Sequence, residues 1–298
     1  MCGFAGFFDS NRETEPSYEI LRSMLQSITH RGPDDEGIWS EGNIYLGHRR
    51  LSIVDLSLAG HQPMLSTCEQ FILAFNGEIY NFQQIRQELE KIKPFEWKGH
   101  SDTEVMLAAI TTWGLEQAIS KFNGMFAFAL WDKKEKTLTL ARDRFGEKPL
   151  YYSQNNERII FGSELTCLEQ FPDLKKEIDR EALGEYFKYT YIPAPWSIYK
   201  DVKKLKPAHY LVWSPHQGII KECCYWDIQS IAEKSQKNTV KLSDKEAIEG
   251  LDALLKDSIS IRMEADVPLG TFLSGGIDSS VVSAIMQQQS SVPVRTFS

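Results

Sequence analysis

The stretch MCGFAGFF, from Met1 to Phe8, places a cysteine second in the chain, in front of an apolar run typical of a strand. If Met1 stays attached, Cys2 is a small apolar residue that packs at the end of this strand. If Met1 is removed, Cys2 carries a thiol and a free α-amine. A free thiol titrates near ~8.5 and an α-amine near ~7.7 to 8.0, so this amine can accept the thiol proton at pH 7. The sequence therefore permits a nucleophile that contains its own base.

Composition limits the class of protein. The 298 residues are 42% hydrophobic and 25% charged, which is typical of a globular chain with one large domain or two. The net charge of −8 disfavours nucleic acid and anionic lipid as partners. Five cysteines without a CxxC pair argue against a disulfide framework, and no run of about 18 apolar residues occurs. We expect a cytoplasmic protein with no nucleic-acid and no membrane partner.

Up to about residue 215 the sequence consists mainly of short strand-like runs such as FILAFNGEIYNF and GMFAFALWD. Helical periodicity interrupts these runs at residues 20–28 and 105–113. Packed strands with a few segregated helices predict an α+β layer fold for residues 2–215.

A second domain is predicted after a polar linker at residues 216–243. Ser243 and Glu246 have capping-box spacing in front of a helix. VPLGTFL, SGGIDSS, VVSAIM and VRTF then follow as strand, glycine turn, helix and strand, the opening of a parallel βαβ unit. Two strands cannot bury both faces of a sheet, so we expect residues 244–298 to be the truncated start of a larger domain.

Asn76 and Gly77 allow two interpretations. By themselves they predict a type I′ hairpin turn. Alternatively, the Asn76 amide and the Gly77 N–H point at one spot, where they stabilise a tetrahedral oxyanion. Asn123 and Gly124 repeat the dipeptide, which shows that it has little specificity alone.

Two charged motifs likewise allow two interpretations each. Ser101 and Glu104 have capping-box spacing, and Asp102 lies in the first helical turn, where the helix dipole favours an anion. Asp102 is therefore either a structural acid or the partner of a substrate ammonium group. Arg49 and Arg50 precede a strand, so only one of them faces a given pocket. That arginine is either solvated or a bidentate clamp on a carboxylate.

SGGIDSS, residues 274–280, places backbone N–H groups at a helix N-terminus and predicts an anion cradle, with a plain glycine turn as the alternative. The stretch lacks the lysine of the Walker P-loop. Asp278 would repel bound phosphates unless it carried a Mg²⁺ ion.

Taken together, these motifs resemble the glutamine-dependent asparagine synthetases, whose amidotransferase half has an N-terminal cysteine nucleophile. The resemblance runs through essentially the whole chain in the family's order. Its segments are MCGFAGFFD, RGPDDEG, GHRRLSIVDLS, GHQPM, FNGEIYN, GHSDTEV, FNGMFAFALWD, RDRFGEKPLYY, FGSEL, YIPAPWSIYKDVKKLKPAHYL and VPLGTFLSGGIDSSVV. Each segment is weak alone, but together and in order they are very specific.

The resemblance implies a four-layer αββα N-terminal-nucleophile sandwich, followed by the start of an α/β nucleotide-binding domain with a pyrophosphate loop. It implies that Cys2, freed of Met1, attacks the side-chain amide of glutamine without a cofactor, while Asn76 and Gly77 form the oxyanion hole. The glutamine-binding residues that it implies are Arg50, Leu51, Ile53, Val54, Asn76, Gly77, Glu78 and Asp102.

The second domain is implied to use ATP and Mg²⁺, with Asp278 as a metal ligand. Its implied ATP-binding residues are Leu273, Ser274, Gly275, Gly276, Asp278 and Ser279. Aspartate would become β-aspartyl-AMP, which ammonia converts to asparagine. Because most of this domain is missing, we expect the chain alone to hydrolyse glutamine only.

Two alternatives stay open: an amidotransferase that acts on another carboxylate, such as a sugar acid in polysaccharide synthesis, and a catalytically silent glutamine-binding relative. Retention of Cys2, Asn76, Gly77, Arg50 and Asp102 argues against the silent relative. A homodimer is among the assemblies that the sequence leaves open.

Overall fold

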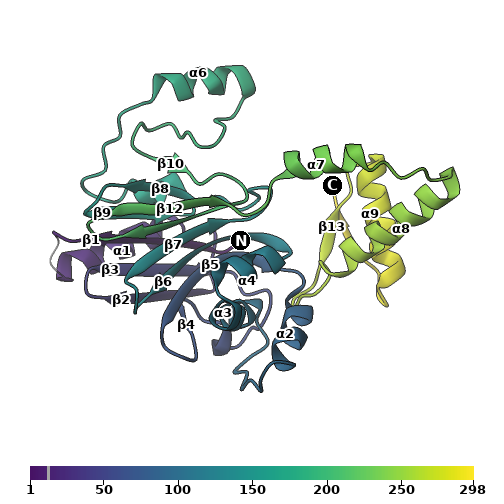
Figure 1. The fold of residues 1–298 in the computed structure, drawn as a ribbon, viewed down its shortest axis with the longest axis horizontal. Coiled ribbons are helices and arrows are strands. Elements are labelled where there is room, and N and C mark those ends of the chain that lie inside the picture. The colour runs from purple at the N-terminus through teal and green to yellow at the C-terminus, as the bar shows by residue number, and fades with distance from the viewer. Residues whose placement is uncertain (12–13) are drawn as a thin grey trace. The chain divides into compact units, whose positions relative to one another are not determined.

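The structure is a computed structural model that describes residues 1–11 and 14–298. The chain divides into two compact units (Figure 1). The first unit comprises Met1–Ser52 and Ser57–Trp226, and the second comprises Ile53–Leu56 and Asp227–Ser298. Each unit is described by itself below.

The first unit contains two six-stranded antiparallel sheets. One sheet has the order β10-β8-β9-β1-β3-β2 and the other the order β12-β11-β7-β6-β5-β4. The strands of the first sheet are β1 (Gly3–Asp9), β2 (Asp35–Glu41), β3 (Ile44–Arg50), β8 (Tyr151–Gln154), β9 (Arg158–Gly162) and β10 (Lys203–Lys204). Those of the second are β4 (Met64–Leu65), β5 (Phe71–Ile79), β6 (Gly124–Asp132), β7 (Thr137–Arg142), β11 (His209–Ser214) and β12 (Gly218–Cys224).

The two sheets pack face to face through one apolar core. Phe4 and Leu46 of the first sheet contribute to the same core as Ala129, Leu140 and Trp213 of the second. Successive side chains of a strand point to opposite faces, so the neighbouring side chains of β1 turn outward. They pack on the apolar face of α1 (Thr14–Ser27), which covers the outer surface of the first sheet together with α5 (Leu165–Leu168).

Helices also cover the second sheet. Helix α3 (Asp102–Trp113) packs on β5, with α2 (Phe82–Glu90) and α4 (Leu115–Lys121) beside it (Figure 1). Two sheets between two helical layers confirm the predicted α+β fold and the αββα sandwich. The remaining helical segments of this unit are the short 3-10 turn Leu58–Gly60 and α6 (Arg180–Tyr189), which stands clear of the sheets (Figure 1).

The range 216–243, expected to be a linker, contains two regular elements. Strand β12 pairs with β11 and belongs to the first unit, and α7 (Ile228–Lys237) follows in the second. One reason that the composition concealed β12 is that it carries the charged residues Lys221 and Glu222, both exposed.

In the second unit, α8 (Asp244–Ser260) begins with the predicted capping box, because Ser243 N–H donates to Glu246 at 2.8 Å and Ser243 Oγ accepts from Glu246 N–H at 3.4 Å. Strand β13 (Gly270–Phe272), helix α9 (Ile277–Gln289) and strand β14 (Arg295–Phe297) follow. The two strands pair in parallel, which confirms the βαβ opening. Within the described part of the chain, no helix is both long enough and apolar enough to cross a membrane.

Candidate functional site

Strand β1 lies inside its sheet, hydrogen-bonded to β3 on one side and to β9 on the other. Cys2 directly precedes β1, and the pairing of Gly3 with Arg49 brings it beside the end of β3. The Cys2 thiol donates to the Leu51 carbonyl oxygen at 3.5 Å, and Leu51 N–H donates to Cys2 Sγ at 3.4 Å. Of the predicted glutamine-binding residues, Leu51 is therefore in direct backbone contact with the sulfur.

The surroundings of Cys2 favour a neutral thiol in the absence of a base. Burial raises the pKa of the Cys2 thiol, and the negative charge of Asp102 raises it further. The hydrogen bond to Leu51, the terminal amine and Arg50 act in the opposite direction on this pKa. Asp102 and Arg50 thus lie close enough to influence the sulfur, and a thiolate forms readily only if a nearby group takes the proton.

Asn76 and Gly77 lie within β5, paired with Ala127 and Phe126, so the hairpin interpretation is wrong. Asn76 is 1% exposed, and its Nδ2 has no hydrogen-bond partner among the described residues. A Cβ at Gly77 would lie 2.2 Å from the main-chain oxygen of Met125, so only glycine fits here. A buried amide donor without a partner is the group that an oxyanion site requires, and it is costly to keep otherwise.

Asp102 is the first residue of α3 and is buried. Its Oδ2 accepts from Ile79 N–H at 2.9 Å, and its Oδ1 accepts from the Thr103 hydroxyl at 3.3 Å. The bond to Ile79 ties this carboxylate to the strand that carries Asn76. Burial raises the pKa of Asp102 to about 6, although these hydrogen bonds and Arg50 lower it.

Arg50 ends β3, is buried, and donates from Nη1 to the Ser57 carbonyl at 3.1 Å. Its charge acts on both Asp102 and Cys2, so the structure brings these three predicted residues together. Glu78 follows Gly77 on β5 and is half-buried.

Ile53 and Val54 belong to the short segment that groups with the second unit, where the Ile53 carbonyl accepts from Asp266 N–H at 2.9 Å. Their part in a glutamine pocket therefore stays a prediction.

His48, on β3, is buried and lies next to the strand that carries Asn76. Its Nε2 lies 2.9 Å from the Phe75 carbonyl, and burial lowers the pKa of its imidazole to about 4. The neutral ring therefore donates to the carbonyl, and at pH 7 it buttresses β5 without changing charge.

Sequence reasoning missed two buried cations near the N-terminus, Arg31 and Lys148. Arg31 Nε donates to the Cys2 carbonyl at 2.9 Å, and its Nη1 pairs with Glu164 Oε1 at 2.7 Å. Lys148 Nζ lies 3.4 Å from Met1 Sδ. The stretches RGPDDEG and RDRFGEKPLYY contain these residues, but nothing in their spacing points to the N-terminus.

In the second unit, the predicted ATP-binding residues form a turn at the start of α9. Gly275 has φ +82°, a conformation that favours glycine, and Gly276 is the N-cap of the helix. Ser274 Oγ and Ser279 Oγ lie 3.1 Å apart, and Asp278 lies in the first helical turn. Leu273, at the end of β13, donates from its N–H to the Phe297 carbonyl at 2.7 Å. Among the described residues, no group of three or more His, Cys, Asp or Glu side chains could by itself hold a metal ion.

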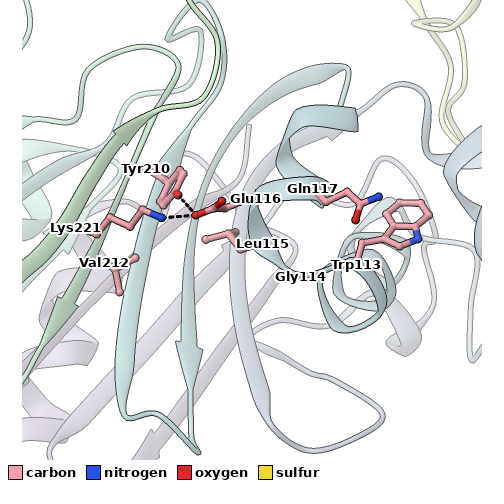
Figure 2. A pocket seen from close by; sticks show the side chains of 8 residues that line it. All are labelled: Trp113, Gly114, Leu115, Glu116, Gln117, Tyr210, Val212 and Lys221. Atoms are coloured by element: carbon pink, nitrogen blue, oxygen red, sulfur yellow. Dashed lines mark hydrogen bonds and ion pairs between the residues drawn. The ribbon is translucent and has the colours of Figure 1, made fainter.

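A separate cavity of about 460 Å³ opens at α4 and β11 (Figure 2). Figure 2 shows Tyr210 and Lys221 pointing toward the Glu116 carboxylate, which accepts from the Tyr210 hydroxyl at 2.8 Å and pairs with Lys221. These polar groups satisfy one another, and the cavity contains none of the predicted site residues. Its lining consists of Trp113, Gly114, Leu115, Glu116, Gln117, Tyr210, Val212 and Lys221.

Comparison with solved structures shows a shared fold. Glutamine phosphoribosylpyrophosphate amidotransferase from Bacillus subtilis superposes with a TM-score of 0.56 at 18% identity, over 99% of this chain and 65% of that one. This chain therefore shares its fold with that solved structure.

Sequence comparison then gives the family. Residues 1–226 match the family described as glutamine amidotransferase domain, so the chain belongs to it, and residues 250–298 match the family described as asparagine synthase. Asparagine synthetase [glutamine-hydrolyzing] 3 of Bacillus subtilis is 34% identical over 100% of this chain and 48% of the relative. Asparagine synthetase [glutamine-hydrolyzing] 1 of the same organism is 37% identical over 97% and 44%. The chain spans about half the length of these relatives.

Proposed function

We propose that this chain contains the glutaminase part of a glutamine-hydrolysing asparagine synthetase, with Cys2 as its nucleophile. The observation that carries the proposal is the buried, unpartnered Nδ2 of Asn76, on the strand that also positions Asp102. An amide donor of this kind has a use once a substrate oxygen develops negative charge. The names of the relatives support asparagine synthesis as the activity of the whole protein.

The reaction begins once removal of Met1 frees the α-amine of Cys2. This amine takes the thiol proton, directly or through a water, and Sγ attacks the side-chain amide carbon of glutamine. The Asn76 amide and the Gly77 N–H stabilise the oxyanion, and the C–N bond breaks as the amine returns its proton to departing ammonia. Water then hydrolyses the thioester to glutamate.

Recognition of glutamine is assigned to the charged groups around Cys2. Arg50 binds the α-carboxylate, since guanidinium matches carboxylate geometry, and ionised Asp102 binds the α-ammonium group together with Glu78. Leu51, Ile53 and Val54 are assigned to the pocket lining through their backbone.

Release of glutamate from glutamine tests this assignment. Cys2→Ala is expected to abolish release, whereas Cys68→Ala, which changes an exposed cysteine, is expected to leave it intact. Intact mass should show that active protein lacks Met1. Full activity in protein that retains Met1, or in Cys2→Ala, would sink the proposal.

For the second unit we assign ATP to the turn Leu273–Ser279 and aspartate to the role of ammonia acceptor. The helix N-terminus and the left-handed Gly275 suit phosphate oxygens. Asp278 fits Mg²⁺ as one carboxylate ligand, because this ion usually takes one or two carboxylates and completes its sphere with phosphates and waters. Bound Mg²⁺ would neutralise phosphate charge during adenylation. Amidation assays on the whole protein, with aspartate and a sugar acid offered in parallel, distinguish the two acceptors.

A cytoplasmic location fits the five free cysteines and stays a prediction, as does a homodimer.

A further inference from the structure

Lys148 is a buried lysine on a rigid loop. Asp143, fully buried, accepts N–H bonds from Phe145 and Glu147 on Oδ1 and from Lys148 on Oδ2, at 2.9 to 3.0 Å. This carboxylate fixes the backbone of residues 143–148 and thereby the root of the Lys148 side chain.

The ammonium group of Lys148 lacks a strong partner. Lys148 is 5% exposed, and the only hydrogen bond of its Nζ to the described residues is to the thioether sulfur of Met1, at 3.4 Å. A thioether is a weak acceptor, and burial of a cation without an anion is costly. Burial and the nearby Arg31 accordingly lower the pKa of Lys148.

A second cation converges on the same place. Arg31 holds the Cys2 carbonyl through Nε, and its buried Nη2 has no partner in the part of the chain that is described. In the chain with Met1 attached, the ionisable groups that act on the α-amine of Met1 are Cys2, Arg31, Lys148 and Asp34. Burial and the two cations lower the pKa of the Met1 amine, against the opposing effect of Cys2 and Asp34, so an amine at this end of the chain lies in the field of both cations.

We propose that Lys148 is a positioning residue for glutamine hydrolysis: once Met1 has been removed, its ammonium group acts on the α-amine of Cys2 and keeps that amine unprotonated at neutral pH. The inference rests on the proposed function, because it gives Lys148 a role through the base of that reaction. The same positive charge favours the Cys2 thiolate. Loss of Met1 also removes this thioether acceptor, and Lys148 and Cys2 already act on one another electrostatically in the chain that retains Met1.

The test replaces the cation and measures a pH profile. In Lys148→Met, the acid limb of kcat/KM for glutamate release should move to higher pH by about one unit, because the amine then holds its proton longer. Lys148→Arg, which keeps the charge, should retain the wild-type limb. Lys134→Met makes the same change at an exposed site and should leave the limb in place. A merely structural lysine would change the rate at every pH equally.

A second readout does not depend on turnover. Alkylation of Cys2 by iodoacetamide, followed by mass spectrometry across pH, should show the same upward shift in Lys148→Met and in Lys148→Gln. Coincident wild-type and variant profiles would overturn the role of Lys148 and leave the glutaminase proposal standing. If the alkylation profiles of the variants shift against the wild type but the wild-type chain releases no glutamate, the action of Lys148 on Cys2 is supported and the proposed function is refuted.

Discussion

Replacement of Asn76 by alanine should separate catalysis from stability. The change removes the buried Nδ2 donor, which has no protein partner among the described residues. Loss of one oxyanion donor typically costs about 2.7 to 4 kcal/mol in the transition state, which corresponds to a fall in kcat of about 10² to 10³-fold. KM for glutamine should change little, because the donor acts mainly on the charged intermediate.

The free energy of unfolding should respond differently. Truncation removes packing inside β5, but it also removes an unsatisfied donor whose burial costs about 1 to 3 kcal/mol. These two contributions oppose one another, so the net change should stay within about 1 kcal/mol. Asn76→Ala should therefore be far less active and almost as stable as the parent chain.

Glutamate release at saturating glutamine measures kcat, and urea unfolding measures stability. Asn123→Ala is the matched control, since it removes an exposed asparagine that also precedes a glycine. A loss of activity below tenfold, or a loss of stability by several kcal/mol, would refute the reasoning, because Asn76 would then have a structural role.

Three further outcomes are expected. In Asp102→Asn, KM for glutamine should rise, whereas in the parent KM should rise only as pH falls through about 6, the raised pKa of Asp102. The free energy of unfolding of the parent should fall as pH rises from about 4 to 6, because the native state holds a proton that the unfolded chain releases, and the variant should lack this change. Gly77→Ala should destabilise the fold by about 1 to 3 kcal/mol in urea, since the new Cβ meets the Met125 oxygen. His48→Gln should leave the activity profile between pH 6 and 8 unchanged. The free energy of unfolding of the parent should fall as pH falls from about 6.5 to 4, because the lowered pKa of His48 makes the native state bind fewer protons than the unfolded chain, and the variant should not show this fall.

The α+β class, the βαβ opening and the capping box at Ser243 could all be predicted because each depends on local periodicity or spacing. The hairpin interpretation of Asn76 and Gly77 failed because pairing of β5 with β6 and β4 overrides a local turn preference. Arg31 and Lys148 were missed because the contact of Arg31 with Cys2 spans 29 positions and that of Lys148 with Met1 spans 147. No short window of sequence contains such pairs.

The position of β1 also bears on the proposed removal of Met1. It is synthesised before both of its neighbours, and one of them, β9, ends only at Gly162. At translation rates of about 5 to 20 residues per second, β1 waits about 8 to 30 s for that neighbour. Under the proposed function, this interval would leave the nascent terminus open to a peptidase that removes Met1. A purification tag fused ahead of Met1 would keep the cysteine's nitrogen in a peptide bond, so tags belong at the other end of the polypeptide.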